Sequence, residues 1–131
     1  MNPYLLTENR VVKLVAQYKE HGSLIIGVDF DYTIYDIQTK EVYTDIVDLV
    51  LEAQKLNCKL CLWTANKERL PRVIELCEEH GLVFDYINES PITIEEGIKK
   101  PHFNLLLDDV AALGQAVEIL QQTIKEITNE K

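Results

Sequence analysis

The stretch that decides the fold covers residues 24–33 and reads Leu24-Ile25-Ile26-Gly27-Val28-Asp29-Phe30-Asp31-Tyr32-Thr33. It begins as an apolar run rich in β-branched residues, which predicts a strand buried on both faces, as in parallel sheets. It ends in two carboxylates and a hydroxyl, at the end of the strand where open α/β sheets bind ligands. An extended chain would direct Asp29 and Asp31 to the same side, about 6.6 Å apart. Two like charges at that spacing are unfavourable unless a cation, a shared proton or water relieves them.

Helical and strand patterns alternate along the rest of the chain. Amphipathic spacing predicts four helices, at residues 7–21, from 44 or 45 onward, 67–80 and 110–127. Apolar runs predict four strands, at residues 24–29, 58–64, 82–87 and 103–107. Thr7 is the expected N-cap of the first helix, and Gly22 its end. This alternation predicts an α/β, three-layer Rossmann-like fold, with a mainly parallel sheet flanked by helices and right-handed crossovers.

The length predicts one domain, residues 1–131, in which residues 1–22 form a helical extension packed on the core. Residues 32–43 lack a long periodic pattern and are expected to form a small flap over the carboxylates. Residues 88–101 are the longest irregular stretch, with one helical turn expected at residues 93–96.

Composition excludes several classes of protein. The formal net charge of −9 argues against broad binding to nucleic acid, which depends on Lys and Arg neutralising phosphates. Because no apolar run approaches the roughly 18 residues of a membrane span and no signal-peptide pattern is visible, we expect a cytoplasmic protein without membrane contact. Three cysteines, an odd number, argue against a disulfide framework. Cys58 and Cys61 form a C-x-x-C spacing, but strand alternation sends them to opposite faces, so we expect them and Cys77 to pack in the core.

Three of the four predicted strands end in polar residues. These are, in chain order, Asp29 and Asp31, Thr64 and Asn66, and Asp108 and Asp109. In a parallel sheet these ends share one edge, so the side chains can meet in one crevice, with Lys100 on the loop before the fourth strand. Hard carboxylate oxygens suit Mg²⁺, which in proteins usually keeps several waters and binds substrate phosphate. The set can therefore hold a divalent metal and a phosphoryl group together.

These residues resemble the haloacid dehalogenase-like superfamily of phosphohydrolases, over nearly the whole chain after Gly22. Four segments carry the resemblance in the family's order, namely Asp29-Phe30-Asp31-Tyr32-Thr33, Leu62-Trp63-Thr64, Lys100-Pro101 and Leu105-Leu106-Leu107-Asp108-Asp109. The resemblance implies an Mg²⁺-dependent phosphomonoester hydrolase that acts through an aspartyl-phosphate intermediate.

The resemblance also implies a role for each motif residue. Asp29 would be the nucleophile and a metal ligand, and Asp31 the general acid and base, with its backbone carbonyl on the metal. Thr64 would bind the transferring phosphoryl oxygens, and Lys100 would balance charge on the nucleophile and the phosphate. The acids that complete the metal site would be Asp108 and Asp109. Beyond the motifs, Asn66 either touches substrate or caps the third predicted helix.

The sequence departs from the family pattern at several positions. Tyr32 replaces a common glycine, and its ring either lies at the mouth of the site or packs under the flap. No acid follows three or four residues after Asp109, where Ala112 and Leu113 stand. Lys99 is an alternative to Lys100. At the start of the third predicted helix, Lys67 and Arg69 could add positive charge near the phosphate, but we expect them to be exposed helix residues without such a role. His102 follows the third motif and could lie near the site, but we expect a structural or solvated role for it.

The spacing between motifs leaves no room for a cap domain, so we expect a capless enzyme. Its open site would take a phosphorylated small molecule or a phosphoprotein, or would be covered by another subunit of a homo-oligomer. The charge of −9 disfavours a polynucleotide end. Two alternatives remain: a non-enzymatic phospho-acceptor like bacterial receivers, which place the acid pair on the first strand and the acceptor later, and a degenerate relative that only binds a partner.

Overall fold

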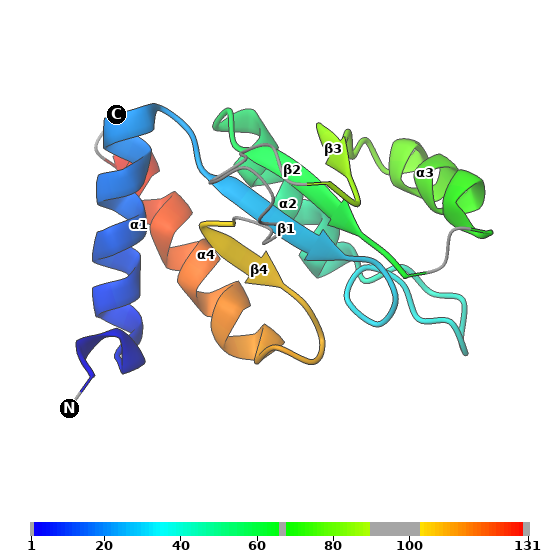
Figure 1. The fold of residues 1–131 in the computed structure, drawn as a ribbon, viewed down its shortest axis with the longest axis horizontal. Helices are drawn as coiled ribbons and strands as arrows, with labels where there is room; N and C mark the ends of the chain where they lie inside the picture. Colours follow the sequence, from blue (N-terminus) through cyan, green and yellow to red (C-terminus); the bar gives the residue numbers. More distant parts are fainter. Residues whose placement is uncertain (1, 66–67, 90–102, 130–131) are drawn as a thin grey trace, which may run out of the picture.

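A computed structural model describes residues 2–65, 68–89 and 103–129 of the chain (Figure 1). Helices and strands alternate as the sequence predicts. In chain order the elements are the 3-10 helix η1 (Pro3–Leu5), α1 (Thr7–His21), β1 (Ile25–Asp29), α2 (Thr44–Lys55), β2 (Lys59–Trp63), α3 (Leu70–Glu79), β3 (Tyr86–Ile87), β4 (Leu105–Leu107) and α4 (Leu113–Asn129).

The four strands form one parallel sheet in the order β3-β2-β1-β4. The chain adds β2 and β3 on one side of β1 and then returns to place β4 on the other side. In such sheets, ligands bind where the strand order reverses, outside the carboxyl ends of the two strands that flank this point. Here that point lies between β1 and β4. The predicted α/β, Rossmann-like sheet flanked by helices is confirmed.

The core lies on one face of the sheet. Along β1, Ile26 and Val28 are fully buried, and they join one apolar cluster with residues of α1, α2, α3 and α4. In Figure 1, α2 and α4 lie behind the strands, and α1 stands beside α4. Strand alternation directs Asp29 away from this core face, because it is one residue beyond Val28.

The opposite face of β1 carries Gly27, against which the ring of Phe103 packs. A Cβ at residue 27 would lie 2.9 Å from three ring carbons of Phe103, so only glycine permits this approach. The same ring meets Trp63 edge to face, with centroids 5.8 Å apart. These contacts connect β1, β2 and the residues just before β4 on this face of the sheet.

The N-terminal helix α1 packs against α4, which makes the helical extension part of the core. It ends at Gly22, whose left-handed φ of 71° lets its N–H reach the carbonyl of Tyr18. The expected N-cap is wrong: Leu6 occupies that position without a side-chain bond, and Thr7 is already helical.

Several boundaries differ from the sequence-based ones. Helix α3 starts at Leu70 rather than 67, with Pro71 in its first turn, and β3 has only two residues. Helix α4 starts at Leu113 rather than 110, because Asp108 folds the chain into a turn first. Its Oδ1 accepts the N–H of Val110, its carbonyl accepts that of residue 111, and the next residue has a φ of 52°.

The expected flap at residues 32–43 is present as a short structured loop, in which Tyr35 bridges to Val42. Asp36 holds it together, since its carboxylate accepts the N–H groups of Gln38 and Thr39 and the hydroxyl of Tyr43. These bonds lower the pKa of Asp36, the Tyr43 bond most of all. The expected helical turn at residues 93–96 falls outside the described residues.

All three cysteines are buried free thiols, as the sequence predicts. Burial raises the pKa of Cys77 to about 12 and that of Cys61 to about 11, so both stay protonated. Within the described ranges, no helix is both long and apolar enough to cross a lipid bilayer.

Candidate functional site

Three carboxylates meet where β1 and β4 end. Oxygens of Asp29, Asp108 and Asp109 all lie within 4.8 Å of one another, and we call these three residues the acid cluster. Asp29 is the last residue of β1, and the other two follow β4 directly. The parallel pairing of Val28 with Leu107 brings the two strand ends together. The sequence thus predicted this meeting correctly.

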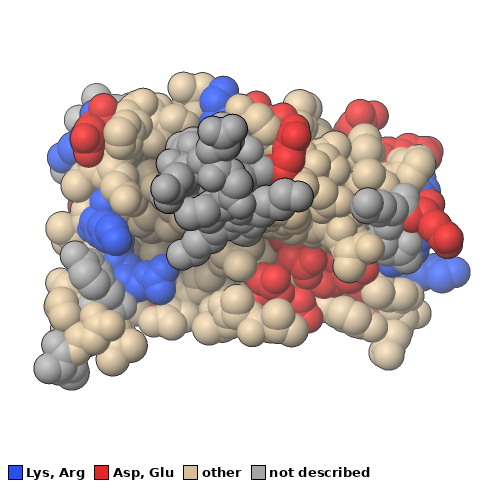
Figure 2. All heavy atoms as spheres, viewed as in Figure 1, with Lys and Arg blue, Asp and Glu red and all other residues tan. Residues whose placement is uncertain are grey.

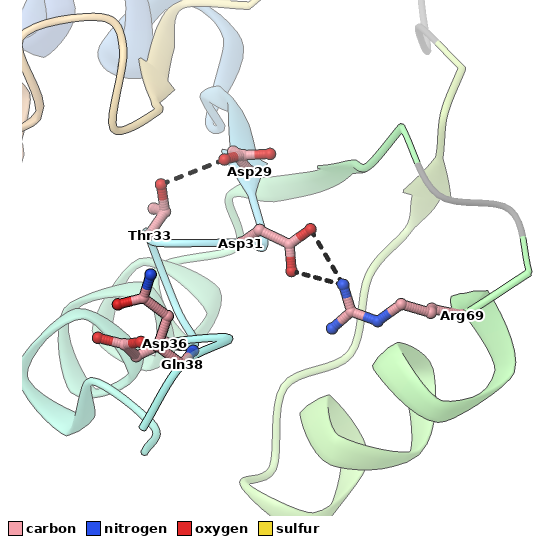
Figure 3. A network of polar contacts seen from close by, with 6 residues as sticks. All are labelled: Asp29, Asp31, Thr33, Asp36, Gln38 and Arg69. Carbon is pink, nitrogen blue, oxygen red and sulfur yellow. Dashed lines mark hydrogen bonds and ion pairs between the residues drawn. The ribbon is translucent and has the colours of Figure 1, made fainter. Parts of the chain in front are cut away.

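A buried hydroxyl ties the two strand ends. Thr33 is fully buried, and its Oγ1 accepts the backbone N–H of Asp109 at 3.0 Å. The same hydroxyl donates to Oδ2 of Asp29 at 3.5 Å (Figure 3). Thr33 therefore fixes the turn after β4 relative to the carboxylate on β1. The sequence placed Thr33 in a motif, but it did not reveal this bridge.

The acid cluster binds a proton unusually tightly. Burial, the charge of Asp108 and a hydrogen bond with Asp109 together raise the pKa of Asp29 from 3.8 to about 7, and burial contributes most. Three crowded carboxylates need a positive partner, and within the described part of the chain no ion pair supplies one to them. A divalent cation with oxygen ligands would replace the proton and relieve the repulsion. The cluster could thus hold a metal ion.

Acidic side chains dominate the surface at this edge. In Figure 2, Asp and Glu atoms gather just below the centre of the face, over the region where β1 and β4 end in Figure 1. An anionic substrate would be repelled there unless cations neutralised part of the charge.

Asp31 faces the other way. Its carboxylate pairs with Arg69, whose Nη1 lies 3.2 Å from Oδ1 and 3.3 Å from Oδ2. Figure 3 shows Asp31 directed at Arg69 and Asp29 directed at Thr33. The expectation that Asp29 and Asp31 point to the same side is wrong, because β1 ends at Asp29 and the chain turns immediately afterwards.

The ion pair of Asp31 also corrects the prediction for Arg69. We expected an exposed role for Arg69, but it lies just before the first residue of α3 and contacts a motif residue 38 positions away in the chain. Strands β1 and β2 are neighbours, so their carboxyl ends lie side by side at one edge of the sheet. Local sequence pattern could not identify Arg69 as the partner of Asp31, because the two residues meet only through the pairing of β1 with β2.

Tyr32 has a backbone conformation that is unusual for its residue type. Its φ is 61°, a left-handed conformation that glycine adopts more readily than tyrosine. Tyr32 is 40% exposed. The pKa of Tyr43 is raised, first by its hydrogen bond to Asp36 and in smaller part by Tyr32.

Thr64 lies at the same edge, one residue beyond β2. The strand's last residue, Trp63, is in register with Asp29, and the backbone N–H of Thr64 is held by Oδ1 of Asn88 at 2.9 Å. The threonine is nearly buried. Asn66, Lys67, Lys99, Lys100 and His102 fall outside the described residues, so their expected positions stay predictions.

No family model and no curated protein matches this chain. Among solved structures, it is similar to a conserved protein from Bacteroides thetaiotaomicron, with 26% sequence identity and a TM-score of 0.63. The similarity covers 76% of this chain and 91% of that one. It supports the α/β fold described above. Because that protein is described only as conserved, the function proposed below is argued from the residues of this chain.

Proposed function

We propose that this chain is a capless, haloacid dehalogenase-like phosphatase that hydrolyses phosphomonoesters through an aspartyl-phosphate on Asp29, with Mg²⁺ as its cofactor. The observation that carries the proposal is the acid cluster, with its carboxylates within 4.8 Å of one another at the edge where the sheet order reverses. The order of the four motifs along the chain supports the same reading.

In the first step, a carboxylate oxygen of Asp29 attacks phosphorus, and the bond from phosphorus to the leaving-group oxygen breaks. Asp31 donates a proton to that oxygen, and the product alcohol departs. In the second step, Asp31 takes a proton from water, the water oxygen attacks phosphorus, and the acyl-phosphate bond breaks to release phosphate and free Asp29. Covalent catalysis of this kind divides one difficult displacement into two easier ones.

The metal would be held by Asp29, Asp108 and Asp109, with the backbone carbonyl of Asp31 as a further ligand. Bound Mg²⁺ would neutralise charge on the phosphoryl oxygens. Thr33 keeps two of these acids in place through its bonds to Asp29 and to the N–H of Asp109. It acts as a positioning residue.

The proposal also covers the substrate, the residues that would contact it and the location of the protein in the cell. Thr64 would contact the phosphoryl oxygens, Lys100 would balance their charge, and Asn66 would touch the substrate. The substrate would be a phosphorylated small molecule or a phosphoprotein, and a second subunit could cover the open site. Three buried free thiols fit a reducing compartment, so a cytoplasmic location belongs to the proposal.

The test is hydrolysis of p-nitrophenyl phosphate with and without Mg²⁺. We expect turnover only with the metal, and a loss of about a thousandfold or more in kcat for Asp29→Asn. The exposed Asp48 of α2 provides the control, because Asp48→Asn removes a similar charge away from the site. Activity that survives Asp29→Asn, or that needs no metal, would disprove the mechanism. A single phosphorylation without turnover would instead identify a receiver-like phospho-acceptor.

A further inference from the structure

The ion pair between Arg69 and Asp31 places a cation beside the proposed general acid. It lies on the β2 side of β1, whereas the acid cluster lies on the β4 side. Both partners remain open to solvent, with 35% of the Arg69 side chain and 28% of the Asp31 side chain exposed. A molecule bound at this edge can therefore reach both groups.

The leaving group of a substrate must lie on this side of the site. Phosphorus would be next to Asp29, and the oxygen that departs would be next to Asp31, which protonates it. Whatever is attached to that oxygen then lies close to Arg69, because Nη1 is only 3.2 Å from the Asp31 carboxylate. Arg69 thus faces the part of the substrate that differs from one phosphomonoester to another.

On the basis of the proposed function, we propose that Arg69 selects substrates whose leaving group carries a carboxylate. The guanidinium already binds a carboxylate, that of Asp31, with both oxygens within 3.3 Å of one nitrogen. A substrate carboxylate can take its place, since guanidinium and carboxylate groups form strong charge-assisted hydrogen bonds. The exchange releases the side chain of Asp31 to turn toward the leaving-group oxygen.

Local charge supports this assignment. A carboxylate on the leaving group would approach Asp31 and the acid cluster, all of like charge, and would be repelled without a cation at that point. Arg69 supplies the cation from the segment before α3, on the side away from the cluster. An uncharged leaving group gains no such contact with Arg69.

The experiment compares two substrates with one carbon skeleton, 3-phosphoglycerate and glycerol 3-phosphate, which differ in a carboxylate against a hydroxymethyl group. In the wild type with Mg²⁺, we expect kcat/KM to favour 3-phosphoglycerate by about 10 to 100-fold, the usual range for a charged hydrogen bond. We expect Arg69→Gln to bring this ratio close to one and Arg69→Lys to keep part of it.

Arg72→Gln is the matched control, because Arg72 lies in α3, three residues after Arg69, and pairs with Glu75 and Glu79 instead. It should leave the ratio unchanged. Inhibition by the product provides a second readout: free glycerate should inhibit the wild type more strongly than Arg69→Gln. A role limited to holding Asp31 in position would lower kcat/KM for both substrates equally and would overturn the proposal.

The outcomes also separate this proposal from the one on which it rests. Turnover of p-nitrophenyl phosphate that depends on Asp29, together with a wild-type ratio near one, overturns the role of Arg69 alone. Absence of turnover for every phosphomonoester overturns both proposals.

Discussion

The carboxylates on the two sides of β1 have different electrostatic surroundings. On the β4 side, Asp29, Asp108 and Asp109 crowd within 4.8 Å, and burial, together with the two other acids, raises the pKa of Asp29 to about 7. On the β2 side, Asp31 meets the guanidinium of Arg69 at 3.2 Å. Among the described residues, no ion pair supplies a cation to the first side, whereas Arg69 supplies one to the second.

This difference teaches how one motif can hold two acids with different tasks. Asp29 and Asp31 are separated by a single residue, yet Asp29 is directed at Thr33 and Asp31 at Arg69. The side with excess negative charge suits a metal and the phosphoryl group, and the neutralised side suits the rest of the substrate. Four changes test this division.

Removing one carboxylate of the cluster should have the largest effect. We expect Asp108→Asn to weaken Mg²⁺ binding by on the order of 100-fold, because it removes a charged ligand. Isothermal titration with Mg²⁺ measures the change, with Asp48→Asn as the control of equal charge. Equal affinities for these two variants would mean that the cluster does not hold the metal.

Thr33→Val breaks the link between the two strands while leaving every carboxylate in place. The N–H of Asp109 loses its acceptor, so we expect the free energy of unfolding to fall by about 1 to 2 kcal/mol in urea titrations, and Mg²⁺ affinity to fall with it. Thr123→Val is the matched control, since Thr123 is equally buried but bonds within α4. The positioning role is wrong if both variants bind Mg²⁺ like the wild type.

The acid cluster should also respond to pH. The pKa of Asp29 is about 7 in the folded protein and ordinarily 3.8, so the folded state binds the proton more tightly. Its contribution to the stability of the metal-free protein is full below pH 3.8 and is lost as the pH rises through about 7. Mg²⁺ competes with this proton and should bind more weakly at pH 6 than at pH 8. Urea titrations across this range should show a smaller pH dependence for Asp29→Asn.

Of these changes, Arg69→Gln should have the smallest effect on Mg²⁺ binding. The ion pair is partly exposed, so we expect a change of no more than about 1 kcal/mol in the free energy of unfolding and about threefold in Mg²⁺ affinity. Calorimetric titration and urea unfolding of this variant measure both quantities. A large loss of Mg²⁺ affinity would show that the two sides are not independent.

Much of the candidate site could be predicted because it follows from local pattern. An apolar run that ends in an acid predicts a buried parallel strand with that acid at its carboxyl edge, and residues 24–29 and 105–108 both have this pattern. Once two such strands are neighbours, Asp29 and Asp108 must meet. Thr33 was visible as a motif residue, but its contacts depend on how the turn after β4 folds back.

Other features could not be predicted from pattern. The direction of Asp31 depends on β1 ending at Asp29, and strand ends are set by tertiary contacts more than by local preference. The start of α4 moved by three residues because Asp108 bonds to the N–H of Val110 and closes a turn there. Neither the end of β1 nor the turn at Asp108 is marked by a periodic pattern in the sequence.

The sequence by itself determined the alternation of strands and helices, the burial of β1 and the gathering of carboxylates at one edge, since these follow from hydrophobic periodicity and the geometry of parallel sheets. Only the tertiary structure decided which carboxylates share the acid cluster and that Arg69 neutralises Asp31. The physical reason is the separation along the chain. Hydrophobic periodicity relates residues that are a few positions apart, whereas the ion pair of Asp31 and Arg69 joins residues 38 positions apart.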